Sequence, residues 1–300
     1  MKKVLLVINP VSGKLKAKVE LFDVLHTMTA HAVIPTVMMT RRRGEAKDIA
    51  ASCARSGKFD AIFCCGGDGT LNEVITGVVS SGERLPVGYI PAGSTNDFAA
   101  ALGLPLGLPE AAASACRALN AGHSTLLDVG RFGSARHFTY VASFGAFAAS
   151  SYSAPQSMKN VLGHFAYLLQ GAKDFFAIKP IHVRCTTKDG RSYEDDYIFG
   201  GVTNTTSVGG IVKLDSTLVD MSDGEFEVVL VKTPKSAGEL NTIVTACLTS
   251  NLKCDMIEFF KAREVKFELP RDIAWTLDGE EAHAVNPLIT NLHKAAELLK

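Results

Sequence analysis

The stretch Gly66-Gly67-Asp68-Gly69-Thr70-Leu71-Asn72 decides the fold, because it stands between an apolar run and a helical pattern. The run Ala61 to Cys65 is typical of a buried strand, and helical spacing follows from Leu71 to Ser80. Glycines let the backbone approach phosphate oxygens, and N–H groups at a helix start donate to anions. Since Asp68 would repel bare phosphate, we expect Mg²⁺ between its carboxylate and the phosphates. The alternative is a tight strand-to-helix turn with an Asp cap.

Two further polar loops follow apolar strands. Asn9-Pro10-Val11-Ser12-Gly13-Lys14 comes after Val4 to Ile8, and Pro91-Ala92-Gly93-Ser94-Thr95-Asn96-Asp97-Phe98 comes after Val87 to Ile90. Ligands of open α/β sheets bind at the carboxyl ends of the strands. Each loop alone is explained as well by a loop start or a helix cap. The three loops together favour a phosphate site.

The first half of the chain alternates strands and helices. Strands that are apolar on both faces and separated by helices predict a parallel sheet covered on both sides. Besides the elements above, we predict a strand at Ala32 to Met39 and helices at Lys14 to Thr29 and Glu45 to Ser56.

After about Asp128 the pattern becomes β-rich, which predicts an antiparallel sheet or sandwich. Helices are expected only at Lys159 to Phe176 and Ser236 to Phe260. The predicted strands are Phe138 to Ser143, Ile181 to Thr187, Tyr197 to Thr203, Phe226 to Val231, Val265 to Leu269 and Ala274 to Leu277.

Composition excludes several classes of protein. Lys+Arg and Asp+Glu balance at 31 each, so no basic field indicates a nucleic-acid partner. The seven cysteines lack the spacing of a zinc ribbon or thioredoxin motif, which favours a reducing cytoplasm. No apolar run approaches the ~20 residues of a membrane-spanning helix, so any membrane contact is expected to be peripheral.

The common nucleotide motifs are absent. Asn9 to Lys14 does not complete the P-loop pattern, and Gly67 to Asn72 lacks the third glycine of a dinucleotide fingerprint. The H-R-D and D-F-G triplets of protein kinases are also missing. A different phosphate-binding fold is needed.

At these motifs the chain resembles the diacylglycerol-kinase catalytic-domain family, in particular its soluble bacterial lipid kinases, which are related to sphingosine and ceramide kinases. The likeness spans nearly the whole length. The Gly-Gly-Asp-Gly-Thr block alone is shared with NAD kinases and phosphofructokinase-like folds. The markers are Asn9 to Lys14, Thr40 with Gly44-Glu45-Ala46, Gly66 to Asn72, Pro91 to Phe98, Leu127-Asp128-Val129-Gly130, Asp223-Gly224 and Asp278-Gly279-Glu280.

The resemblance implies a three-layer α/β nucleotide-binding domain, residues 1–128 plus 286–300, and a β-sandwich-like lipid-substrate domain, residues 129–285. It implies that Asp278 is the general base, assisted by Glu280, although a β-turn alone would explain Asp278-Gly279. Asp68, Asp97 and Asp128 would organise the catalytic Mg²⁺, partly through water. The residues implied to contact ATP are Asn9, Ser12, Gly13, Thr40, Gly66, Gly67, Asp68, Gly69, Thr70, Asn72 and Ser94.

A second, structural Mg²⁺ is implied at Asp223-Gly224, held by the Asp223 side chain and by nearby main-chain carbonyls, those of Asp220 and Glu225. The preceding Lys213 to Ser222 departs from the family's apolar-Pro-small run. A hairpin turn is the alternative.

The implied reaction is transfer of the ATP γ-phosphoryl group to a lipid hydroxyl, with diacylglycerol giving phosphatidic acid. The alternatives are NAD-kinase-like ribose phosphorylation and a non-catalytic lipid- or nucleotide-binding regulator. Ala148 to Ala177 would offer an apolar mouth to acyl chains at a membrane surface, or form ordinary core. Phosphatidylglycerol and sphingoid bases are further candidate acceptors, and a homodimer is left open.

Overall fold

The structure is a computed structural model that describes residues 1–94, 96–145, 179–208, 212–215, 217–270 and 273–300. The chain forms two compact units. The first comprises Met1–Val129 and Lys294–Lys300, and the second comprises Gly130–His293. The chain leaves the first unit within strand β5 (Thr125–Phe132) and returns within strand β17 (Leu288–Leu298).

The first unit is built on a parallel sheet in the order β2-β1-β3-β4, with the end of β17 beside β4. Leu6 at its centre pairs with Val37 on one side and Phe63 on the other. The sequence steps outward from β1 in one direction to β2 and in the other to β3, so the order reverses at β1. The strands are β1 (Lys2–Ile8), β2 (Val33–Met39), β3 (Ala61–Gly66) and β4 (Val87–Pro91).

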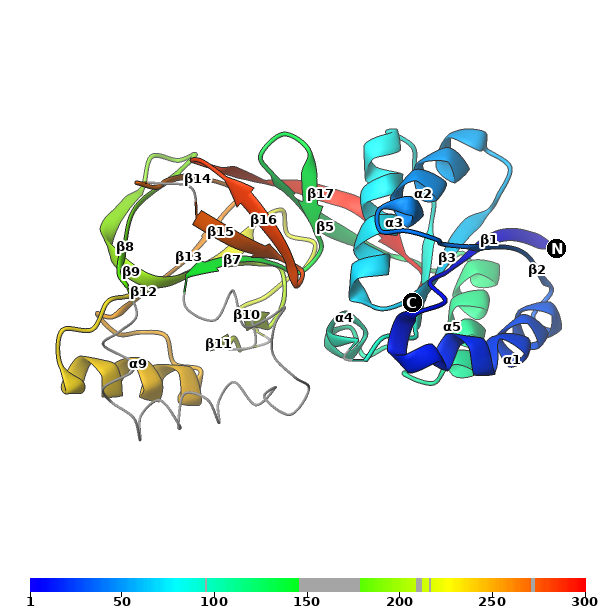
Figure 1. The fold of residues 1–300 in the computed structure, drawn as a ribbon, viewed down its shortest axis with the longest axis horizontal. Helices are drawn as coiled ribbons and strands as arrows, with labels where there is room; N and C mark the ends of the chain where they lie inside the picture. Colours follow the sequence, from blue (N-terminus) through cyan, green and yellow to red (C-terminus); the bar gives the residue numbers. More distant parts are fainter. Residues whose placement is uncertain (95, 146–178, 209–211, 216, 271–272) are drawn as a thin grey trace. The chain divides into compact units, whose positions relative to one another are not determined.

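Helices cover both faces of this sheet, α2 and α3 on one side and α1 and α5 on the other (Figure 1). Leu6 and Ile8 pack into a core with Val24 and Met28 of α1. On the opposite face, a Cβ at Gly77 would lie 2.3 Å from the Lys47 carbonyl oxygen, so only glycine permits this spacing of α3 and α2. The helices are α1 (Lys16–Ala30) after the 3₁₀ turn η1 (Ser12–Leu15), α2 (Glu45–Ser56), α3 (Asp68–Ser81), α4 (Asp97–Ala101) and α5 (Leu108–Ala121).

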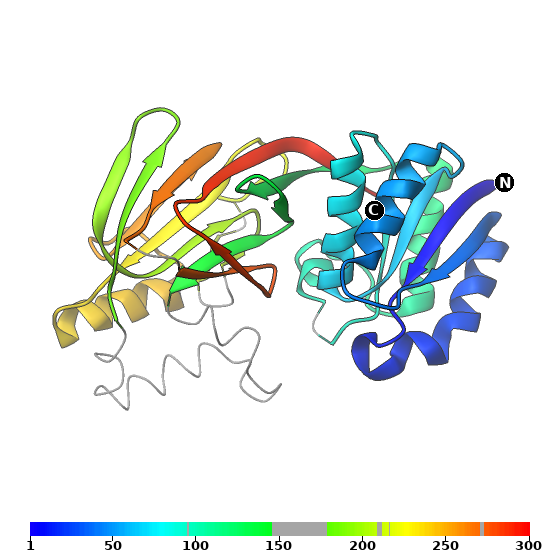
Figure 2. The same cartoon turned by 45° about the horizontal axis from the view of Figure 1, so that its top comes forward.

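The second unit is an antiparallel sandwich (Figure 2). The first half of β9 pairs with β8, and its second half lies between β7 and β12, so this strand belongs to both layers. The other strands are β6 (Arg136–Phe138), β7 (Val141–Gly145), β8 (Ile181–Thr187), β9 (Ser192–Thr203), β10 (Ser207–Val208), β11 (Val212–Lys213), β12 (Phe226–Lys232), β13 (Ile257–Ala262), β14 (Glu264–Glu268), β15 (Ile273–Leu277) and β16 (Glu280–Ala284).

Alternation along β12 serves two cores. Phe226, Val228 and Leu230 point into the sandwich, which is centred on the fully buried Trp275. Val229 and Val231 point the other way, into a core that includes helix α9 (Ala237–Thr249). Because alternate residues of β12 face opposite sides of the sheet, the strand packs into the sandwich on one side and against α9 on the other.

The expected fold class, an α/β domain with a β-sandwich-like domain, is confirmed. The helix predicted from Ser236 to Phe260 is wrong beyond Thr249, because Ser250 adopts φ 55° and the chain returns as β13. The strand predicted at Phe138 to Ser143 is divided between β6 and β7. The helix predicted at Lys159 to Phe176 lies outside the described residues.

Candidate nucleotide site and carboxylate clusters

The three polar loops of the first unit meet backbone to backbone. A Cβ at Gly13, where φ is 53°, would lie 2.0 Å from the Ala92 carbonyl oxygen. A Cβ at Gly93 would lie 2.6 Å from the Cα atom of Gly67. Because any side chain at Gly13 or Gly93 would push the loops apart, the packing of the loops requires glycine at both positions.

The central loop offers unused donors at the start of α3. In the part of the chain that the structure describes, the backbone N–H groups of Gly67, Asp68 and Gly69 have no acceptor. The next N–H groups, of Thr70 and Leu71, already bond to the Gly67 carbonyl. These N–H groups stand at the positive end of a 14-residue helix, which is where proteins commonly bind anions.

Asn9 ties the first loop to the central one. Its Nδ2 donates to Thr70 Oγ1 at 3.1 Å, its Oδ1 accepts from Val11 N at 3.2 Å, and its carbonyl accepts from Ser12 N. The structure thus brings together the predicted residues at positions 9–13 and 66–70. Thr40 sits at the end of the neighbouring β2, where its N–H bonds to the Ile8 carbonyl.

Asp68 is held by the third loop. Its Oδ2 accepts from Asp97 N at 2.9 Å, and its Oδ1 accepts from Phe98 N at 3.4 Å and from the Tyr89 hydroxyl at 3.2 Å. Burial raises the pKa of Asp68 and the charge of Asp97 raises it further, against the lowering effect of these hydrogen bonds. Tyr89 was not predicted, because a tyrosine inside a buried strand has the pattern of core.

Asp68 and Asp97 are neighbouring carboxylates, and the charge of Asp97 acts on Asp68. Neither has an ion-pair partner among the described residues. Mg²⁺ prefers such oxygens and keeps several waters. Asp128 is buried and accepts from Lys294 N at 2.7 Å, which fixes its carboxylate beside this residue of β17, whose φ is 52°. No cluster of three metal-binding side chains occurs in the described ranges.

Two other residues, Asn96 and Glu73, fix the backbone near the central loop. Asn96 locks the third loop, since its Oδ1 accepts from Gly93 N at 2.8 Å and its Nδ2 donates to the Gly93 carbonyl at 3.1 Å. Glu73 on α3 accepts from the N–H groups of Gly44 and Ala46, which join the start of α2 to α3. Sequence reasoning missed Glu73, because a Glu on a helix usually faces solvent.

The remaining predicted contacts are less closely tied to the loops. Ser94 lies in the third loop and is exposed. Asn72 lies one turn into α3, where its Oδ1 accepts from Thr76 Oγ1 at 3.4 Å.

In the second unit, the Asp278 carboxylate is buried and strongly bonded. Thr139 donates to its Oδ2 through both N (2.6 Å) and Oγ1 (2.8 Å). Tyr140 N and Val141 N donate to its Oδ1 at 3.0 and 2.9 Å. Burial raises the pKa of Asp278, whereas these four bonds stabilise its charged form and lower it. Its neighbour Glu280 faces Arg136 at 3.7 Å.

The acidic turn around Asp223 does not fit a divalent ion. Asp223 Oδ2 accepts from Lys261 Nζ at 2.8 Å and its Oδ1 accepts from Glu225 N at 2.9 Å. Asp220 Oδ1 is engaged by the N–H and hydroxyl of Ser222, both at 2.9 Å. An ammonium group 2.8 Å from the principal ligand leaves no room for Mg²⁺ and its oxygen shell.

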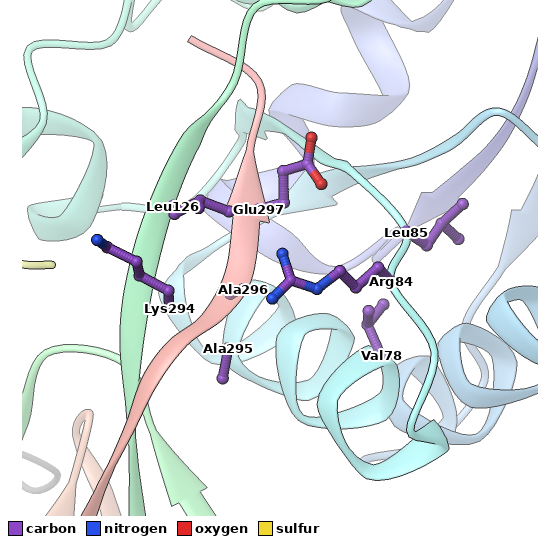
Figure 3. A pocket seen from close by; sticks show the side chains of 8 residues that line it. All are labelled: Val78, Arg84, Leu85, Leu126, Lys294, Ala295, Ala296 and Glu297. Carbon is purple, nitrogen blue, oxygen red and sulfur yellow. The ribbon is translucent and has the colours of Figure 1, made fainter. Parts of the chain in front are cut away.

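A small cavity beside β17 is separate from these loops (Figure 3). Its volume of about 10 Å³ holds roughly one water molecule. The lining side chains are Val78, Arg84, Leu85, Leu126, Lys294, Ala295, Ala296 and Glu297.

The predicted lipid mouth, Ala148 to Ala177, lies outside the described residues. Among the helices that are described, none combines the length and the apolar character needed to cross a bilayer.

Two family models match consecutive parts of the chain. Residues 3–132 match the diacylglycerol kinase catalytic domain, and residues 141–299 match the YegS C-terminal NAD kinase beta sandwich-like domain. A diacylglycerol kinase of Bacillus subtilis is 31% identical over 98% of this chain and 95% of its own length. One from Staphylococcus aureus is 29% identical over 98% of this chain and 90% of its length. A crystal structure of a diacylglycerol kinase from Bacillus anthracis has a TM-score of 0.74 at 23% identity, covering 99% of this chain and 96% of that one, which shows the shared fold.

Proposed function

The chain belongs to the diacylglycerol kinase catalytic-domain family, and from that premise we propose that it transfers the γ-phosphoryl group of ATP to a lipid hydroxyl. Diacylglycerol is the proposed acceptor and phosphatidic acid the product. The relatives' names support a lipid kinase. The choice of diacylglycerol, and ATP as donor, are our proposals.

The observation that carries the proposal is the meeting of three glycine loops around the unused N–H groups of Gly67, Asp68 and Gly69. Such a cradle suits the phosphates of a nucleotide, because bare backbone donors can approach several oxygens at once. Asn9, Ser12 and Thr40 would line its first edge and Ser94 its last. Glu73 would keep the α2 start aligned with the cradle.

We propose that Asp68 and Asp97, with Asp128, hold the catalytic Mg²⁺ partly through water. The ion when bound would neutralise charge on the phosphate oxygens. Tyr89 and the Asp97 and Phe98 N–H groups orient Asp68 for this task. Removal of the Tyr89 hydroxyl should therefore weaken magnesium binding and leave nucleotide binding by the glycine loops unchanged.

Asp278 is the proposed general base, which takes the proton of the acceptor hydroxyl. Burial raises the pKa of this carboxyl and so favours proton uptake, but four hydrogen bonds oppose it. Three of the donors are backbone N–H groups that cannot turn away. The Thr139 hydroxyl can rotate, so we propose that it releases Asp278 Oδ2 as the proton arrives. Glu280, paired with Arg136, would support the turn that carries Asp278.

The test is a radiolabelled-ATP assay on mixed micelles that contain diacylglycerol, phosphatidylglycerol or a sphingoid base, with NAD in a parallel reaction. Label in the organic phase with diacylglycerol is the expected result. Asp278→Asn should lower that rate by about 10² to 10⁴ and leave ATP binding nearly intact. Label on NAD would support ribose phosphorylation instead, and ATP binding without any transfer would support a regulator. Equal rates for wild type and Asp278→Asn would refute the proposed role of Asp278 as general base.

A further inference from the structure

We propose that the ammonium group of Lys261 is a built-in structural cation for the 220–227 turn, standing where a divalent metal was expected. On this view the second unit needs no metal of its own. The inference is independent of the phosphoryl-transfer proposal, because it concerns a turn held within the sandwich.

Strand register brings the charged groups together. Glu227 on β12 lies directly opposite Lys261 on β13. The Lys261 Nζ atom is 2.8 Å from Asp223 Oδ2 and 3.2 Å from Glu227 Oε1. One ammonium group thus joins the turn residue Asp223 to the first buried carboxylate of the strand that follows it.

Burial makes this ammonium group necessary. Glu227 is 0% exposed, and in the described part of the chain neither of its oxygens has a hydrogen-bond donor with good geometry. It lies on the β12 face that carries Val229 and Val231. A buried carboxylate left without a cation costs far more than an exposed one, because the interior screens charge poorly. The Lys261 ammonium group therefore offsets the negative charge of the buried Glu227 carboxylate.

The turn itself depends on the same contact. Asp223 is followed by Gly224, which has φ 88°, and its second carboxylate oxygen accepts from Glu225 N. The Lys261 bond on one oxygen and the backbone bond on the other fix this carboxylate at the entry to β12. A divalent ion would have to displace the ammonium group and repel it at close range. We therefore expect wild-type protein to bind no Mg²⁺ at Asp223.

The first test compares wild type with Asp223→Asn, in EDTA and in millimolar magnesium chloride without nucleotide. Asn keeps the acceptor for Glu225 N but cannot serve as a charged metal ligand. Both chains should show the same magnesium-induced change in Tm, because any magnesium bound at Asp68 and Asp97 affects both equally. A larger change in wild type would overturn the proposal.

The second test removes the ammonium group. Lys261→Met should lower Tm in EDTA by about 5 °C. Magnesium should then recover part of that loss, because Asp223 and Glu227 are left as a carboxylate pair without a cation. The double variant Lys261→Met/Asp223→Asn should show no such recovery.

Two results would refute the role of Lys261: a wild-type Tm for Lys261→Met in EDTA, or equal magnesium gains in the single and double variants. A Lys261→Met chain that folds only with magnesium present supports the proposal. If it folds under neither condition, the comparison of wild type with Asp223→Asn decides alone.

Discussion

Replacing Thr139 by valine should cost more stability than loss of an ordinary hydroxyl. The Thr139 Oγ1 atom lies 2.8 Å from Asp278 Oδ2, and both residues are buried. Valine has nearly the same shape, so no cavity accompanies the lost bond. Hydrogen bonds to charged groups contribute about 1.5–3 kcal/mol, against about 0.5–1.5 kcal/mol for neutral pairs. We expect Thr139→Val to lower the free energy of unfolding by about 1.5–3 kcal/mol at pH 7.

The assay is urea unfolding of wild type, Thr139→Val and Thr139→Ser at several pH values. Serine keeps the hydroxyl and serves as the matched control. The hydrogen bond from Thr139 Oγ1 favours the charged form of Asp278. Its loss in Thr139→Val should therefore raise the pKa of Asp278 above the wild-type value. The stability difference should accordingly shrink as pH falls and Asp278 becomes protonated.

A kinetic readout separates this effect from general damage. If Asp278 is the base, the acid limb of the rate profile should move to higher pH in Thr139→Val, with the KM for ATP unchanged. A stability loss below about 0.5 kcal/mol at pH 7, outside the range for charged acceptors, would refute the reasoning. So would a loss that is the same in acid.

Three further predictions follow from other contacts. Tyr89→Phe should raise the pKa of Asp68 and raise the magnesium concentration needed for half-maximal activity, with ATP affinity in EDTA as the control; an unchanged magnesium requirement would contradict it. Burial raises the pKa of Glu227 to about 7, above its ordinary 4.5, so the native state holds the extra proton and stability from this group falls as pH rises through that interval. Glu227→Gln should flatten this slope in urea melts at pH 5 and 8. Gly13→Ala should weaken nucleotide binding at least tenfold in calorimetry, since its Cβ would clash with Ala92; unchanged affinity would show that the loops can separate.

The first unit was largely predictable because its signals are local. Apolar runs ending in glycine loops located β1, β3 and β4, and the same loops meet in the structure. Helix α5 was missed although Pro109 near its start and Gly122 at its end mark its boundaries. Its buried residues do follow a helical period, so this signal could also have located the helix: Leu108, Ala111, Ala112, Ala115, Cys116, Ala118 and Leu119.

The second unit was harder because its decisive contacts are remote in sequence. Asp278 meets Thr139 across 139 residues and Lys261 meets Asp223 across 38, and no spacing rule connects such pairs. The apolar run that becomes β13 was read as helix, since a short apolar segment has no period of its own. Antiparallel pairing with β12 and the turn at Ser250 make this segment a strand.

The two crossings between the units have a consequence for how such enzymes diversify. β5 and β17 are hydrogen-bonded neighbours, so residues 130–293 begin and end at adjacent points, like a cassette with both connectors on one side. The corresponding segment of a relative could therefore replace residues 130–293 without changes to the strands and loops of the first unit. The two units can then change separately within one gene.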